Sequence, residues 1–472
     1  MSGEALVIGG GPSGLIAAAY LAQAGLHAVV LEAEDAPGGG CANRIPVANA
    51  VVPAGPQALI ALDPRVVKEL KLTRHGLKFA ARDLPLAGLR GEGKPLLLPR
   101  DAHEARRNIT VHSERDAGRF GDFRHGLYAF AREMRALWWE DGVVEGEKPE
   151  TELRRMKVTS AAALLDAAFD AEALKAAFVF DAMAGGLSPS DAGSALLLAW
   201  RAAQEMCGLQ GAAAIPQDGP GRLAEALVSA AEAAGVEIRT HARVERIALS
   251  GSKVAGVVLE DGEEIAAPLV FSSLTRKTTL LDFLPPGAVG FATAQELEQV
   301  QAAGEAKLVL ALNGLPELLQ QPCRFVLAER LENGIAAHME ARQGRVPAEP
   351  ALEAVVSALG SSYLLSVAIR PLPLVPAEGW GTLTAPLIQA VLQRLERHMP
   401  DLADTISGMN FVPPQPGDPL TVSHIVSGWR ERVATPVEGL FLCGESAEPV
   451  PAVSGRAARI AAGLAVPKET AS

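Results

Sequence analysis

Short apolar runs alternate with helical stretches at the start of the chain. Residues 5–8 form an apolar run that glycines follow directly, which is typical of a buried parallel strand. Small and apolar residues recur at helical spacing over residues 14–24, and Gly25 ends that helix. A second apolar run, residues 28–31, leads into Glu32. The pattern therefore predicts a complete βαβ unit in the first 32 residues.

The stretch from about 60 to 215 has a different pattern, rich in alanine and mainly helical, with charged loops that interrupt it. Residues 160–184 predict one or two amphipathic helices, which end at Gly185. No nucleotide-binding pattern occurs in this stretch. We therefore expect it to face a substrate or to cover the site.

Alternating strand and helix patterns return near Gly219, and Asp261–Gly262 between two apolar runs predicts a β-hairpin. After about residue 280 the pattern changes again, and it closes with a strand and a helix. The expected helices are 223–234, 385–399 and 454–464, and the expected strands are 236–239, 242–249, 254–259, 264–267, 269–271, 308–312 and 439–444.

Composition narrows the class of protein. A length of 472 residues suggests two or three domains, and 49% hydrophobic with 21% charged residues indicates a globular chain. The net charge of −12 argues against a nucleic-acid partner, which needs a basic face. The four cysteines form no CxxC pair, and the nine histidines do not cluster, so we expect reduced, mostly buried thiols and no metal site.

No uninterrupted apolar stretch is long enough to cross a bilayer, and the apolar N-terminus lacks the basic residues of a signal peptide. A cytoplasmic location is therefore the expectation. The mean hydropathy of +0.17 is somewhat high for a soluble protein. It leaves room for an apolar substrate tunnel or for monotopic contact with a membrane.

The loop after the first expected strand carries the pattern Gly9-x-Gly11-x-x-Gly14. The first glycine allows a tight turn, the second lets a pyrophosphate approach the backbone, and the third lets helix and strand pack closely. The pyrophosphate then lies at the N-terminus of the helix, where Pro12 and Ser13 follow the turn. Glu32 ends the second strand, where a carboxylate can bind ribose hydroxyls. This order of elements predicts a dinucleotide site.

A second glycine run, Gly38-Gly39-Gly40, follows Glu32 and the neighbouring Ala33. By itself it reads equally well as a flexible loop. Together with the βαβ unit it resembles the second glycine signature of the amine-oxidase and phytoene-desaturase branch of FAD enzymes, in which the backbone passes close to the cofactor. The arginine that usually follows the glycine pair is absent, and Arg44 is a candidate replacement.

The end of the chain resembles the same superfamily at Gly444-Glu445. The resemblance implies that Glu445 binds the ribityl chain of the flavin, and that the helix after Val453 and Ser454 points its N-terminus at the pyrimidine end of the ring. The histidine-proline segment that carotenoid desaturases usually carry here is replaced by residues 445–451, which have no histidine and no glycine run.

Further segments extend the resemblance from residue 5 to about 465 and place the chain near the phytoene desaturase-related group of the amine-oxidase and carotenoid-desaturase superfamily, beside the pyridine nucleotide-disulphide oxidoreductase domain-containing protein two group. They are residues 20–22, 63–67, 72–77, 83–86, 219–221, 235–238, 244–247 and 306–316. The resemblance implies non-covalent FAD, with the backbone of Val244 against the adenine. It also implies an α/β fold: a Rossmann-type, glutathione-reductase-like FAD-binding domain with an inserted mixed-sheet and helical substrate domain.

On that reading the chain crosses between the two domains four times. The FAD-binding domain comprises residues 1–75, 216–282 and 426–472. A helical substrate insertion occupies residues 76–215, and a second substrate segment occupies residues 283–425.

Lys307 is the one candidate catalytic residue. It stands among apolar residues in an expected strand, where burying a lysine is costly. In amine oxidases, a lysine at the corresponding strand holds a water near flavin N5. A lysine at the edge of the sheet that reaches solvent is an equally good reading.

The resemblance implies hydride transfer from a small, mostly apolar substrate to flavin N5, as in a dehydrogenase, desaturase or isomerase. One alternative is an amine oxidase, a class in which the resemblance implies two aromatic rings facing each other before the flavin. The chain has only three tyrosines, so Trp429 and Phe441 are the candidates for these rings. The other is a flavoprotein that mainly binds a partner. Without a second GxGxxG, oxygen or a quinone is the expected electron acceptor, and a homo-oligomer is a further expectation.

Overall fold

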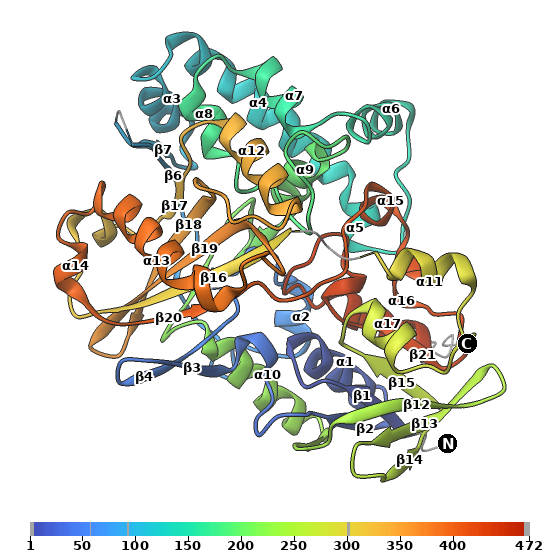
Figure 1. Cartoon of the computed structure of the whole chain (residues 1–472). Helices are drawn as coiled ribbons and strands as arrows, with labels where there is room; N and C mark the ends of the chain where they lie inside the picture. Colours follow the sequence, from blue (N-terminus) through green and yellow to red (C-terminus); the bar gives the residue numbers. More distant parts are fainter. Residues whose placement is uncertain (1–3, 57, 92–93, 300–302, 467–472) are drawn as a thin grey trace.

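The computed structural model describes residues 4–56, 58–91, 94–299 and 303–466, and it has a mixed α/β fold built around two large β-sheets (Figure 1). One sheet has five parallel strands and lies in the lower part of that view. The other has seven strands and lies above it, at the left. A group of helices covers the top of the molecule.

The five-stranded sheet contains the predicted βαβ unit. Its strands, in spatial order, are β11 (Glu237–Arg239), β2 (His27–Leu31), β1 (Glu4–Ile8), β15 (Leu269–Ser272) and β21 (Leu440–Leu442), and every pairing is parallel. Helices α1 (Pro12–Gln23), α10 (Gly221–Ala233) and α17 (Arg456–Ala465) pack on one face. Successive side chains of β1 point to opposite faces of the sheet. Ala5 and Val7 contact the helices, whereas Leu6 and Ile8 face the opposite side.

A three-stranded antiparallel sheet covers that opposite face. It consists of β12 (Val244–Ser250), β13 (Lys253–Leu259) and β14 (Glu264–Ala266), with core residues such as Val257 packed on the parallel sheet. Gly262 supplies the turn with a φ of 88°, so the predicted hairpin is confirmed. Parallel strands need cover on both faces, and the helices and this sheet provide it.

The seven-stranded sheet is mixed. Its order is β20 (Ile406–Val412), β16 (Ala303–Leu312), β19 (Ser362–Pro373), β18 (Ala351–Leu359), β17 (Arg324–Leu327), β6 (Leu86–Leu89) and β7 (Leu96–Leu98). Leu308 and Leu310 face α13 (Trp380–Glu396) and α14 (Leu402–Thr405). Val309 and Ala311 face the hairpin of β3 (Asn43–Val47) and β4 (Ala50–Pro53) instead.

The stretch from 60 to 215 is mainly helical, as expected, but its described part also contains β6 and β7 of the seven-stranded sheet, which the sequence pattern did not predict. These strands have only four and three residues, and β6 pairs in parallel with β17, whose residues lie far along the chain. Such short strands carry too little periodicity to be recognised. The helices of this stretch are α2 (Pro64–Glu69), α3 (Ala102–Thr110), α4 (Glu114–Glu133), α5 (Arg135–Trp139), α6 (Glu147–Met156), α7 (Ala161–Ala168), α8 (Glu172–Ala177) and α9 (Ala195–Ala203).

The remaining elements are short. They are strands β5 (Phe79–Ala81), β8 (Glu205–Met206), β9 (Leu209–Gln210) and β10 (Ile215–Pro216), helices α11 (Phe291–Leu297), α12 (Leu331–Arg342), α15 (Val422–Val426) and α16 (Trp429–Val433), and single turns of helix at Gly39–Cys41, Thr278–Asp282, Glu317–Gln320 and Glu445–Ala447. No described helix is both long and apolar enough to cross a membrane. All four cysteines are free, and only Cys207 is exposed.

Candidate functional site

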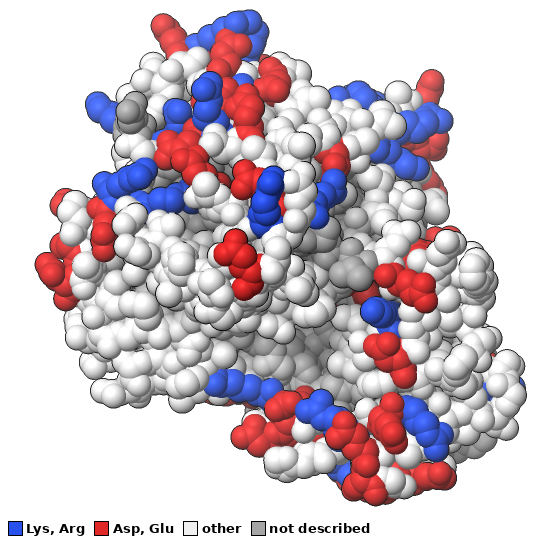
Figure 2. All heavy atoms as spheres, in the orientation of Figure 1, with Lys and Arg blue, Asp and Glu red and all other residues white. Residues whose placement is uncertain are grey.

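A cavity of about 1170 Å³ lies between the two large sheets. The face of the molecule in Figure 2 is hollowed in this region, and most residues around the hollow are uncharged. The ends of β1 and β2, the glycine loop and the segment after β21 form one part of its wall. Residues of β16, β19 and the loop after β20 form another. The volume exceeds the roughly 300–1,000 Å³ of ordinary small-molecule sites, so there is room for a large cofactor and a substrate.

The first glycine loop turns tightly at the end of β1. Gly9 has a φ of 89°, and a Cβ on Gly14 would lie 2.0 Å from the carbonyl oxygen of Gly9. Only glycine at position 14 therefore allows the start of α1 to touch the loop. Gly11 precedes α1, and no side chain caps the first N–H groups of this helix. The N-terminus of α1 is consequently open to an anion from the cavity.

Glu32 is buried at the end of β2, and its carboxylate is held by the backbone. One oxygen accepts a hydrogen bond from the Gly10 N–H at 2.8 Å, and the other accepts one from the Glu34 N–H at 3.0 Å. These bonds fix the carboxylate beside the glycine loop. The remaining lone pairs of the Glu32 carboxylate can accept further hydrogen bonds from hydroxyl groups of a ligand in the cavity.

The second glycine run touches the first. Gly38 and Gly39 have φ values of 118° and 52°, and the Gly38 N–H donates to the Gly10 carbonyl at 2.7 Å. A Cβ on Gly39 would lie 2.9 Å from the Cα of Gly11. The two loops thus form one backbone cradle, from which side chains are excluded.

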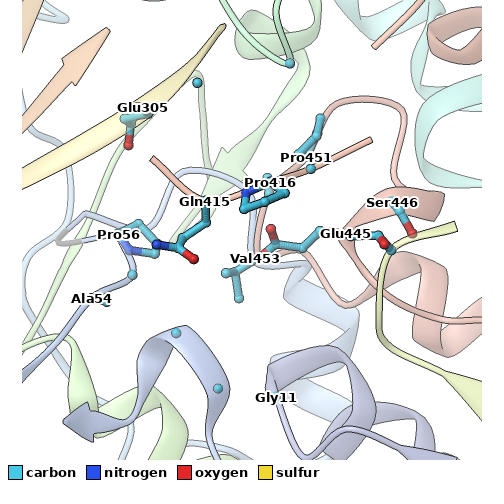
Figure 3. Close-up of a pocket in the computed structure, with 18 of the residues that line it drawn as sticks. Gly11, Ala54, Pro56, Glu305, Gln415, Pro416, Glu445, Ser446, Pro451 and Val453 are labelled. Atoms are coloured by element: carbon cyan, nitrogen blue, oxygen red, sulfur yellow. The ribbon is translucent and has the colours of Figure 1, made fainter. Parts of the chain in front are cut away.

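Glu445 projects into the cavity from the turn after β21. In Figure 3, Ala54, Pro56 and Glu305 lie at one side of the open space, Glu445 and Ser446 lie at the other, and Gly11 lies below. Glu445 is exposed, and it lines the cavity. Desolvation by the surrounding cavity walls raises the pKa of its carboxyl, and the neighbouring Glu448 raises it further.

The start of α17 is closed by Glu448. The Glu448 carboxylate accepts hydrogen bonds from the Ser454 hydroxyl at 2.5 Å and from the Ala457 N–H at 2.9 Å. The Ser454 hydroxyl in turn accepts a bond from the Arg456 N–H at 2.9 Å. A buried carboxylate therefore interacts with the positive end of this helix, and the side chain of Ser454 turns away from the cavity.

The structure brings most of the predicted site residues to one cavity, although their roles stay predictions. The residues that line it are Gly9, Gly11, Pro12, Ser13, Glu32, Ala33, Gly39, Gly40, Val244, Lys307, Glu445 and Val453. Those that do not line it are Gly14, Gly38, Arg44, Gly444 and Ser454.

The five residues outside the lining have visible structural partners. Gly14 and Gly38 pack against the glycine loop and α10, and a Cβ on Gly444 would lie 2.3 Å from the Ser273 carbonyl oxygen. Arg44 donates to the carbonyl of Ala36 in its own loop. Arg44 is therefore engaged with the backbone beside the cavity.

Lys307 lies on β16 and faces the cavity rather than the outer solvent, with 8% of its surface exposed. Its Nζ donates to the carbonyl of Ala54 at 3.0 Å. Burial lowers its pKa to about 8, and the acidic groups Glu305 and Cys41 offset that effect only in part. The amine therefore exists in both protonation states near neutral pH.

Several residues of the wall gave no signal in the sequence. His338 on α12 is 1% exposed, and burial lowers its pKa to about 4. By geometry, neither ring nitrogen has a hydrogen-bond partner in the described part of the chain. Arg324 on β17 pairs with Asp181 and Glu353. These residues come from distant segments of the chain, so their spacing in the sequence could not group them into one site. The prolines at 413, 416 and 419, in the loop after β20, are the one local sequence feature that indicates an ordered loop at the cavity. Among the described residues, no cluster of metal ligands occurs.

Comparison with known proteins gives the site a context. The family model described as flavin containing amine oxidoreductase matches residues 12–311. The rat pyridine nucleotide-disulfide oxidoreductase domain-containing protein 2 is 26% identical over 97% of this chain and 92% of its own length. A phytoene desaturase of Cercospora nicotianae is 29% identical over 57% of this chain and 44% of its own length.

Solved structures show the same fold. An oxidoreductase from Methanosarcina mazei superposes with a TM-score of 0.66 at 17% identity, covering 98% of this chain and 99% of that one. A putrescine oxidase bound to putrescine gives a TM-score of 0.66 at 16% identity, covering 99% of this chain and 98% of that one.

The cavity fits FAD. The two glycine loops pack backbone against backbone at Gly11 and Gly39, and the open N-terminus of α1 beside them suits a pyrophosphate. Glu32 and Glu445 both line the cavity and offer carboxyl oxygens for hydroxyl groups of a ligand. The remaining wall, on β16, β19 and the loop after β20, is left to face a substrate.

Proposed function

This chain belongs to the flavin containing amine oxidoreductase family and is an FAD-dependent oxidoreductase, and we propose that it dehydrogenates a mostly apolar substrate. FAD, when bound, accepts a hydride from a carbon atom at N5 of its ring. The resemblance to desaturases and the walls of the cavity support this reaction class.

The observation that carries the proposal is the scarcity of phenyl, phenol and indole rings around the cavity. Among the described residues that line it, only Phe180 and Phe283 carry such a ring. The Arg370 guanidinium covers the Phe180 ring at 3.6 Å, so this ring does not form an open facing pair. The resemblance to amine oxidases implies two rings that face each other before the flavin, and this cavity offers none.

The two aromatic residues suggested by the sequence lie elsewhere. Trp429 is fully buried in the core beside α17. Phe441 on β21 stacks on Phe271 with 5.1 Å between ring centroids. Neither lines the cavity, so neither can hold an amine substrate against the flavin.

Apolar side chains and paired charges make up much of the substrate-facing wall. The Arg324 guanidinium is engaged by Asp181 and Glu353, and Arg370 pairs with Glu305 at 3.1 Å. Paired charges attract a charged substrate less than free ones. Apolar residues complete the wall, among them Leu59, Ile60, Met183, Leu187, Val355, Val412 and Leu420. An apolar molecule can pack against these side chains and exclude water from the reacting carbon.

Lys307 supports amine oxidation as the second candidate. Its Nζ stands at the cavity wall, and a pKa of about 8 lets it bind a water molecule as a donor or as an acceptor. The proton lost from the amine nitrogen, or from the carbon next to the one that loses the hydride, can thus pass to this group or to its water. The same geometry would serve either substrate class, so Lys307 does not by itself choose between them.

Product analysis tests the proposal. The names of the relatives suggest phytoene as an apolar probe, and cyclohexylamine and putrescine as amine probes. The purified holoprotein is incubated with each probe under air or with a soluble quinone. We expect a product of phytoene that has lost two hydrogens, with a longer conjugated chromophore. An aldehyde or ketone formed from the amines, with phytoene unchanged, would favour the second candidate instead.

The remaining expectations belong to the same proposal. We assign the parallel sheet and its βαβ unit to the Rossmann-type, glutathione-reductase-like class of FAD-binding domain. We also propose that the FAD is bound non-covalently and that oxygen or a quinone accepts the electrons. The proposed location is the cytoplasm, with monotopic contact to a membrane as a variant. Assembly into a homo-oligomer is a further part of the proposal.

A further inference from the structure

A second cavity lies outside the cofactor site, between α4, α9 and the first residues of β6. Its volume is about 330 Å³, at the lower end of the roughly 300–1,000 Å³ typical of small-molecule sites. Its walls combine apolar and charged side chains, and the large apolar lining residues are Leu84, Leu86, Leu98, Phe120, Phe123, Leu127, Phe178 and Leu198. The cavity can therefore hold a small molecule with an apolar body.

Positive charge predominates among its polar residues. Four arginines line it (Arg100, Arg124, Arg201 and Arg324) but only two carboxylates, Asp83 and Asp181. Arg100 forms two hydrogen bonds with Asp83, at 2.7 and 2.8 Å. Arg324 binds Asp181 and Glu353. Within the described residues, neither Arg124, which donates to the Pro99 carbonyl at 3.2 Å, nor Arg201 forms a direct ion pair with a carboxylate.

Arg201 is the more deeply buried of these two cations. It lies on α9 with 9% of its surface exposed, and one Nη donates to the Gly211 carbonyl at 3.1 Å. Its Nε has no hydrogen-bond partner within the described part of the chain. Burial lowers the pKa of this guanidinium and the nearby Arg324 lowers it further, while the carboxylates of Asp181 and Glu353 offset part of this effect from a distance. A buried cation of this kind is costly unless an anion compensates it.

We propose that this second cavity binds the carboxylate of an amphipathic organic acid, with Arg201 as the group that pairs with it. A carboxylate matches the planar donor fork of a guanidinium, and such charge-assisted hydrogen bonds are stronger than neutral ones. Phe123 and Leu127 on α4 would contact the aliphatic or aromatic body. The carboxylate would supply the Nε acceptor that the fold lacks.

The site borders the cofactor cavity without being part of it. Asp181 and Arg324 line both cavities, so their ion pair forms the partition between them. The smaller cavity has its own polar rim at Asp83 and Arg100, whose side chains are about one-third exposed (31% and 38%). Binding there needs no oxidation chemistry, and the proposal stands independently of the reaction proposed above.

Isothermal titration of the holoprotein with octanoate tests the proposal, with 1-octanol and octylammonium as probes of the same chain length. We expect octanoate to bind at least about tenfold more tightly than either of the other two. Arg201→Gln should weaken octanoate by about tenfold or more, because the cation that pairs with the carboxylate is gone. The matched control is Arg155→Gln on α6, an arginine whose side chain is half exposed (50%), and it should bind octanoate as the wild type does.

A second variant locates the ligand and does not depend on the folding of the first. Leu127→Trp places a large ring at a partly exposed position of the wall and should abolish octanoate binding while the flavin spectrum and the melting temperature are retained. The proposal is overturned if octanoate and octanol bind equally, if octanoate does not bind at millimolar concentration, or if a folded Arg201→Gln or Leu127→Trp variant binds octanoate as tightly as the wild type.

Discussion

Arg456 Nε donates to Asp63 Oδ2 at 3.0 Å, and both side chains are fully buried although 393 residues of chain separate them. The same guanidinium donates to Gln204 at 2.8 Å and to the Ala61 carbonyl at 3.2 Å. It also lies over the ring of Trp139, at 4.2 Å from the centroid. One arginine at the start of α17 thus connects the segment around α2 with the helical region of α5 and α9.

Removal of that arginine should destabilise the fold strongly. In Arg456→Met the Asp63 carboxylate keeps only Arg65 as a cationic partner, which is itself 29% exposed. Breaking a buried pair by removing one member typically costs about 3–5 kcal/mol. We expect a loss of this size in the free energy of unfolding, measured by urea denaturation.

The control lies three residues further along the same helix. Arg459 pairs with Glu69 at 3.0 Å, and both side chains are about one-third exposed (32% and 39%). Arg459→Met should therefore cost about 1 kcal/mol or less. Equal losses for the two variants would contradict the assignment of a special role to Arg456.

A Cβ in the glycine cradle should weaken FAD binding. In Gly39→Ala the new methyl group would lie 2.9 Å from the Gly11 Cα, and the φ of 52° is unfavourable for alanine. Displacing the backbone by this amount costs on the order of 1–3 kcal/mol, which corresponds to roughly ten- to a hundredfold in affinity. The measurement is a titration of the apoprotein with FAD, followed by flavin fluorescence.

Gly126→Ala on α4 is the matched control, because a Cβ there meets no atom within 4 Å. It should bind FAD normally and gain slightly in stability, since alanine favours a helix more than glycine does. An unchanged FAD affinity in Gly39→Ala would show that the two glycine loops do not carry the cofactor.

Lys307 should make the stability depend on pH. Its pKa is about 8 in the folded protein and 10.5 as a free side chain, so between these values the unfolded chain holds more protons. Stability therefore rises with pH across this window, and the destabilising effect of the buried cation is fully present below pH 8.

The comparison variant is Lys307→Met, which lacks this titration. The free energy of unfolding of the wild type minus that of the variant should increase by about 2–3 kcal/mol from pH 7 to pH 10, because each pKa unit is worth about 1.4 kcal/mol. Urea denaturation at the two pH values measures it. A difference that does not change with pH would mean that Lys307 stays protonated when folded.

The parts of the fold that were predictable rest on local patterns. Apolar runs identified β1, which glycines follow, and β2, which Glu32 follows, and Asp261–Gly262 identified the hairpin of β13 and β14. The glycine loop was predictable for the same reason, since Gly9 and Gly14 contact each other within one turn. Short spacing and backbone geometry are enough to specify such features.

The parts that were not predictable depend on partners far away in the chain. Strand β6 is recognisable only through its pairing with β17, and the pair of Asp63 and Arg456 only through the packed core. Ser454 was correctly placed next to α17, but its hydroxyl binds Glu448, a direction that no sequence pattern specifies. The second cavity, which Arg201 lines, likewise forms only where α4, α9 and β17 pack together.

An anaerobic absorbance titration of the purified protein is the measurement that tests the account most directly. The account predicts flavin bands near roughly 375 and 450 nm, released by heat denaturation, with the 450 nm band bleached by the apolar polyene probe. A protein without these bands that also fails to bind added FAD would contradict the cofactor site. A flavin that is bleached by amines and left unchanged by the polyene would contradict the proposed reaction.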